Sequence, residues 1–133
     1  MIAVLLAAVL QASLPMRSID KGTTSNVDAG RQASARSTEE WTALWRLHGG
    51  ERTRPNVDFS REVVVAVFMG TRPTAGFAVD IVGVRQEGQA LVVSYRETRP
   101  APDALTAQVL TSPFHIVAVP RGATTDVRFE RVN

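Results

Sequence analysis

The strongest constraint on the fold is an apolar run in the middle of the chain, REVVVAVFM from Arg61 to Met69. Its valines favour a β-strand. The apolar residues stand at consecutive positions, which is typical of a strand that is covered on both faces. The rest of the chain must therefore supply a covering element on each side of this strand.

The segment STEEWTALWRLHGG predicts a short amphipathic helix as one of these covers. Ser37 and Glu40 have the spacing of a capping box, in which two side chains satisfy free backbone N–H groups at a helix start. Gly49 and Gly50 supply the residues that commonly end a helix. Between them, apolar positions recur at helical spacing and form one inner stripe. That stripe consists of Trp41, Leu44, Trp45 and His48.

Four further segments have strand character. Phe77–Arg85 and Ala90–Thr98 flank a hairpin turn predicted at Gly88, and Phe114–Pro120 and Thr125–Val132 follow later in the chain. Together with shorter candidates near the N-terminus, they predict an α+β fold. It consists of a mainly antiparallel β-sheet of about six to seven strands covered by one short amphipathic helix.

Length and charge limit the function classes. The 133 residues favour one domain, expected over residues 16–133. The net charge is only +2, and the arginines are spread along the chain without a run, so no nucleic-acid partner is predicted. The chain has no cysteine, which excludes disulfides and thiol catalysis.

The N-terminal block MIAVLLAAVLQASLP is apolar but shorter than the roughly 20 residues of a membrane-spanning helix. Its length suits the apolar region of a secretory signal, so residues 1–12 are predicted to be a signal peptide. The protein is then exported, periplasmic or secreted, with no stable membrane span after signal removal. The alternative is that this block forms a buried strand.

The segment GTRPTAGF follows the central strand and is the main candidate for a binding site. No Gly-Lys-Ser/Thr sequence or helix follows it, so it is not a phosphate-binding loop. A proline-stiffened loop with an arginine and an aromatic residue suits protein recognition, although it could also be only a turn. The segment ETRPAPDAL is the expected neighbour. The predicted partner-binding residues are Gly70, Thr71, Arg72, Pro73, Thr74, Gly76, Phe77, Arg99 and Pro100.

The two histidines, His48 and His115, have no further ligands at metal-binding spacing, so no metal is predicted. His48 ends the predicted helix, where an imidazolium would interact favourably with the helix dipole. His115 lies in a strand, facing solvent or half-buried with its hydrogen bonds satisfied. A small hydrolase using His115 with Ser94 or Ser112 is one alternative, although neither serine lies in a nucleophile-elbow sequence. A small-ligand pocket between helix and sheet is another. No catalytic residue and no cofactor is predicted.

Three segments together resemble the PrcB C-terminal domain family of protease-complex subunits. They are the Gly-x-x-Pro-Thr-x-Gly-aromatic motif from Gly70 to Phe77, the Arg-Glu-Thr-x-Pro motif ending at Pro100, and the Thr-Ser-Pro-Phe-His motif ending at His115. The likeness extends over about residues 30–121. The family is named after a subunit that associates with a secreted subtilisin-like protease and supports its stability. The resemblance therefore implies a non-catalytic accessory role with a secreted or envelope protease as partner.

The sequence RPTAGF is also similar to a loop of chagasin-type cysteine-protease inhibitors, Asn-Pro-Thr-Thr-Gly-aromatic. Arg72 replaces the asparagine, Ala75 replaces the second threonine, and the second, glycine-rich loop of that family is missing. This likeness covers six residues. It implies a protease inhibitor as an alternative function.

Overall fold

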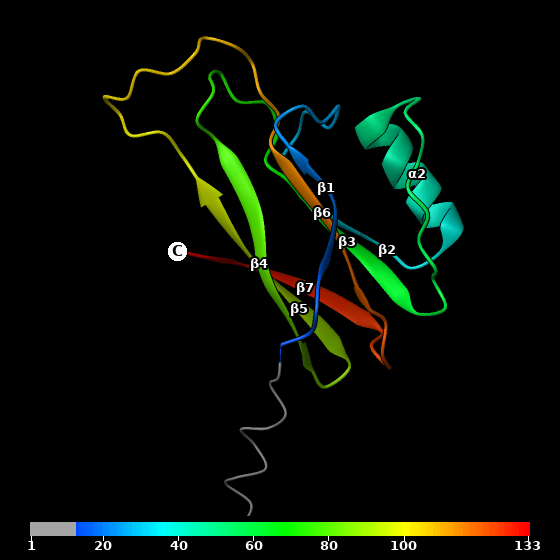
Figure 1. Ribbon diagram of the computed structural model, residues 1–133. Helices are drawn as coiled ribbons and strands as arrows, with labels where there is room; N and C mark the ends of the chain where they lie inside the picture. Colours follow the sequence, from blue (N-terminus) through cyan, green and yellow to red (C-terminus); the bar gives the residue numbers. More distant parts are fainter. Residues whose placement is uncertain (1–12) are drawn as a thin grey trace, which may run out of the picture.

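The computed structural model describes residues 13–133 (Figure 1), so the predicted signal peptide at residues 1–12 lies outside the described residues. The described residues form one helix and seven strands. In order, they are β1 (Arg17–Gly22), β2 (Arg31–Ala35), α2 (Thr38–Gly49), β3 (Glu62–Phe68), β4 (Ala78–Glu87), β5 (Ala90–Thr98), β6 (Phe114–Pro120) and β7 (Asp126–Val132).

The strands form two sheets. The first is fully antiparallel with the order β1-β6-β3-β2, and the second has the order β4-β5-β7, in which β7 runs parallel to β5. The α+β class, the strand number and the single helix are confirmed. The division into two sheets is new, because a single sheet was expected. One 12-residue helix covers only one face of β3, and the second sheet covers the other.

The molecule therefore has three layers: helix α2, the four-stranded middle sheet and the three-stranded outer sheet (Figure 1). Strand β3 lies in the middle layer and is buried on both faces, as its sequence predicts. Val63, Val65 and Val67 pack between the two sheets. The alternate residues Val64, Ala66 and Phe68 pack against the helix side, as the period of two in a strand requires.

Helix α2 begins after Ser37, whose Oγ accepts the N–H of Glu40 at 3.2 Å. The second half of the capping box is displaced by one residue, because Glu40 accepts the N–H of Arg36. Trp41 and Trp45 lie on the inner face, and their indole N–H groups donate to the backbone oxygens of Pro55 and Arg52, both at 2.8 Å. The two tryptophans thus anchor both the sheet and the loop that follows the helix.

Candidate functional site

The loop between β3 and β4, residues 69–77, carries the chain from the middle sheet to the outer sheet (Figure 1). Gly70 begins this crossover with a φ of 81°, and a β-carbon there would lie 2.7 Å from the backbone nitrogen of Gly30. The next residue, Thr71, donates its N–H to the oxygen of Asp28 at 3.0 Å. The start of the loop is therefore fixed against the segment that precedes β2, and only glycine fits at its first position.

The loop between β5 and β6, residues 99–113, lies beside it at the same end of the molecule (Figure 1). The N–H of Arg72 donates to the oxygen of Thr111 at 2.7 Å, and the N–H of Thr111 donates back at 3.0 Å. Farther along, the N–H of Ala75 donates to the oxygen of Ala107 at 3.0 Å. We call these two segments the apical loops. Their backbone hydrogen bonds hold them as one surface, which brings Arg99 and Pro100 to the same end as Gly70–Phe77.

Two of the predicted contact residues are turned toward the base of this surface. The Arg72 guanidinium donates to the oxygen of Met69 at 3.1 Å and lies 5.7 Å from the centre of the Phe77 ring. Phe77 in turn packs against the core between the sheets. The Nε of Arg72 is buried without a hydrogen-bond partner. In this geometry the side chains of Arg72 and Phe77 pack between the loop and the core of the protein and stabilise the loop conformation.

The other predicted residues differ in exposure. Gly70 is buried, and Thr74 and Pro100 are half-buried. A β-carbon on Gly76 would lie 2.9 Å from Cβ of Pro100, so this glycine lets the two apical loops approach closely. The residues that present themselves to solvent are Thr71, Pro73, Gly76 and Arg99.

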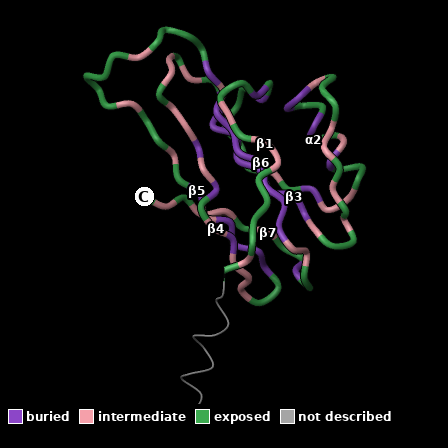
Figure 2. Tube along the Cα trace, viewed as in Figure 1, coloured by how far each residue is buried: buried purple, intermediate pink, exposed green. Residues whose placement is uncertain are grey.

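The most exposed apolar side chains of the apical loops were not among the predicted residues. Leu105 is fully exposed, Leu110 is 76% exposed and Val109 is 53% exposed. Figure 2 shows the loop between β5 and β6, which carries these three residues, as an exposed arm that stands away from the buried layers. A group of large apolar residues in solvent is typical of an interaction site. The signal in the sequence was the apolar content of DALTAQVL in a proline-bounded segment without strand or helix periodicity.

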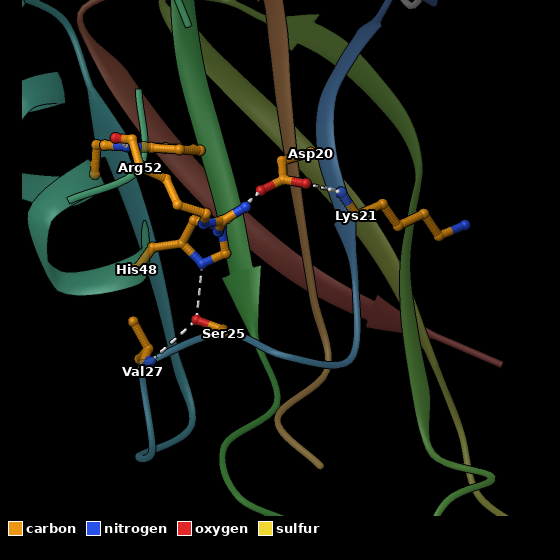
Figure 3. Close-up of polar contacts among 7 residues, drawn as sticks. Asp20, Lys21, Ser25, Val27, His48 and Arg52 are labelled. Atoms are coloured by element: carbon orange, nitrogen blue, oxygen red, sulfur yellow. Dashed lines mark hydrogen bonds and ion pairs between the residues drawn. The ribbon is translucent and has the colours of Figure 1, made fainter. Parts of the chain in front are cut away.

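A polar cluster lies at the C-terminal end of helix α2 (Figure 3). The ring of His48 is fully buried, with Nδ1 2.8 Å from Oγ of Ser25 and Nε2 2.8 Å from Oδ2 of Asp20. The Arg52 guanidinium lies 3.6 Å from the same carboxylate oxygen. Burial lowers the pKa of His48 below its usual value, with a further lowering by Arg52, and the hydrogen bond to Asp20 offsets only part of this. Burial therefore favours the neutral ring over the imidazolium that would interact with the helix dipole.

Serine, histidine and aspartate in one chain of hydrogen bonds are also the components of a hydrolase triad. Here the Oγ of Ser25 accepts the N–H of Val27 at 3.0 Å, and Ser25 is 8% exposed. The backbone N–H groups of Ser25 and Asn26 are bonded to Ser112 and His48. The hydroxyl thus has little access for a substrate and no free neighbouring N–H to stabilise an oxyanion. The cluster instead joins the helix end to β1 and to the connection between β1 and β2.

His115 connects the two sheets. Its Nδ1 accepts the N–H of Ile81 at 2.9 Å, so in the neutral ring Nε2 carries the proton and donates to Oγ of Ser18 at 3.0 Å. Burial lowers the pKa of His115, and the nearby Lys21 lowers it further. A ring in this tautomer has no free lone pair toward Ser18 and is not a general base for it.

The serines that sequence reasoning paired with His115 are bonded elsewhere. Ser94 donates to Glu130 at 2.8 Å, and Ser112 lies 3.4 Å from the hydroxyl of Thr71. Within residues 13–133 no group of three or more potential metal-binding side chains comes together. The same part of the chain contains no helix long and apolar enough to cross a membrane.

The family model described as PrcB C-terminal matches residues 63–120, from the start of β3 to the end of β6. This span contains both apical loops. No curated protein and no solved structure matches the chain. The match confirms, over these residues, the family that the sequence motifs indicate.

Proposed function

We propose, from the match of residues 63–120 to the PrcB C-terminal family model, that this protein is a non-catalytic accessory domain of a protease complex. Its partner is an exported or envelope protease, and the protein itself is exported. The apolar N-terminal block supports the export part of this proposal. The apical loops supply the contact surface.

The observation that carries the proposal is the position of Leu105, Val109 and Leu110, three exposed apolar side chains on one arm. In the free protein, each such side chain leaves apolar surface in water, and a partner would remove it. The arm is tied at Ala107 and Thr111 to the neighbouring loop. This bracing lowers the ordering cost of binding.

Affinity capture from the envelope fraction of the native host tests this surface. The full chain is the bait, and a double variant, Leu105→Ser with Leu110→Ser, removes the apolar contacts without touching a buried residue. Leu47→Ser is the matched control, because Leu47 is 53% exposed on helix α2. We expect a protease to co-purify with the wild type and the control and to be lost with the double variant. Retention by the double variant would assign binding to another surface.

The purified pair then separates an accessory protein from an inhibitor. An accessory role predicts a longer lifetime of the protease against autolysis, with its peptidase activity retained. An inhibitor predicts a loss of activity that follows complex formation. Turnover of ester substrates by the isolated chain, abolished by His115→Ala, would instead support the hydrolase alternative and overturn the non-catalytic assignment.

A further inference from the structure

In the part of the chain that the structure describes, strand β7 has an open edge. Strand β4, at the other end of the outer sheet, is covered: the N–H of Ile81 is bonded to His115, the oxygen of Val84 accepts the N–H of Leu14 at 2.8 Å, and Asp80 pairs with Lys21 of β1. Strand β1 is interrupted by a bulge between Ser18 and Asp20. By contrast, β7 pairs with β5 without a register shift.

Within residues 13–133, the backbone hydrogen bonds of β7 go only to β5 and to Gln89. The strand contains no proline. A regular edge without a bulge, a proline or a cover is a template for another strand.

The side chains of β7 alternate between two faces. Val127 and Phe129 pack toward the core between the sheets. The opposite face carries charges: Arg128 is 59% exposed and lies 3.3 Å from Glu87, and Glu130 is 42% exposed and lies 2.5 Å from Arg85. Both side chains are partly exposed, and their ion-pair partners within the chain lie on β4, across β5 from the open edge.

We propose that the open edge of β7 pairs with β7 of a second copy of this chain, antiparallel and centred on Phe129. In this register Phe129 faces Phe129 on the inner face. On the outer face, Arg128 of each copy stands opposite Glu130 of the other. The interface is isologous, as a two-fold axis requires, and it contains two opposite-charge pairs of the kind that stabilise neighbouring strands.

The two neighbouring two-fold registers oppose like charges. A two-fold axis at Arg128 would place Arg128 against itself and Asp126 against Glu130. An axis at Glu130 would place Glu130 against itself. A shift by one residue would turn the apolar face of one copy toward the solvent face of the other. The register at Phe129 overlaps all seven residues of the strand and leaves no like charges opposed.

The resulting dimer has a continuous six-stranded outer sheet, and its two apical ends point in opposite directions because the paired strands are antiparallel. A seven-residue strand pair buries less surface than a standard stable interface. Association should therefore depend on protein concentration.

Sedimentation velocity of the full chain over a concentration series, followed by paired charge reversals, tests the proposal. Arg128→Glu alone and Glu130→Arg alone each oppose like charges and should weaken dimerisation by about tenfold or more. A mixture of the two variants should form heterodimers, because every pair across the axis is then of opposite charge. Circular dichroism and thermal unfolding verify that each variant is folded.

Cross-linking fixes the register independently. The chain has no cysteine, so Arg128→Cys mixed with Glu130→Cys should form a disulfide between copies, since directly opposite residues are within disulfide range. Either variant alone should cross-link much less. A wild type that stays monomeric at all concentrations, or a mixture of charge variants that stays monomeric while the wild type dimerises, would overturn the proposal.

Discussion

Among single residues, His48 and His115 are those whose protonation should alter the stability of the fold. Burial lowers the pKa of each ring, so the folded protein keeps both rings neutral at pH values where the unfolded chain, with a pKa near 6.5, already takes up protons. The free energy of unfolding is therefore unaffected by these histidines above about pH 6.5. It decreases as the pH falls below that value, because the unfolded chain binds protons that the folded protein does not. The limit is about 1.4 kcal/mol per pH unit for each histidine.

Urea unfolding between pH 7.5 and pH 5 measures this slope. His48→Gln should reduce it, because glutamine retains polar contacts without titrating in this range. An equal free energy of unfolding at both ends of the range would contradict the prediction.

The helical stripe predicted His48 as an inner residue. It could not predict Asp20 and Ser25 as partners, because they lie 28 and 23 residues away in sequence.

Gly70 is a further residue at which a substitution should lower the free energy of unfolding by a predictable amount. Gly70→Ala would force a side chain into a φ of 81° and place its β-carbon 2.7 Å from Gly30. We expect a loss of about 1–3 kcal/mol in the free energy of unfolding. Gly83→Ala is the control, since a β-carbon there meets nothing within 4 Å. Equal losses in both variants would show that the loop start is not constrained as described.

At the scale of elements, β3 holds the layers together. Val65 is fully buried between the sheets, so Val65→Ala should cost about 2–3 kcal/mol through lost burial and the remaining cavity. Val82→Ala removes the same atoms from a side chain of β4 that is 40% exposed, and it should change stability by less than about 0.5 kcal/mol. Guanidinium unfolding of the two variants gives both values, and a similar loss in both would argue against the layered core.

The predictability of the elements follows the range of the forces that form them. Strand β5 was predicted with its observed bounds, and β3 and β4 within two residues at each end, because local apolar patterns define them. The short strand β2 is polar and exposed along much of its length, and no local pattern distinguishes it from a loop. The division into two sheets depends on which strands pair over long distances. Alternation along one strand does not contain that information.

For the whole molecule, a sequence pattern cannot show whether the two proline-containing loops share one surface, and the backbone hydrogen bonds between Arg72 and Thr111 answer this. Two loops separated by two strands meet only through tertiary structure. The nine predicted contact residues include Arg72 and Phe77, whose half-buried positions can be known only from the folded chain. Their direct role in binding stays a prediction, and the exposed Leu105 and Leu110 are the sharper test.

The two surfaces proposed for this molecule lie on different parts of it, the apical loops and the edge of β7, and they should fail independently. Arg128→Glu should weaken dimerisation by about tenfold or more and leave the affinity of one subunit for its protease unchanged. The double variant Leu105→Ser, Leu110→Ser should do the reverse. Sedimentation and surface-immobilised binding, performed on the same four samples of wild type, each variant and the combination, read both properties. If loss of the dimer also removed partner binding by the single subunit, the partner would have to contact β7, and the apical loops would not be the whole binding surface.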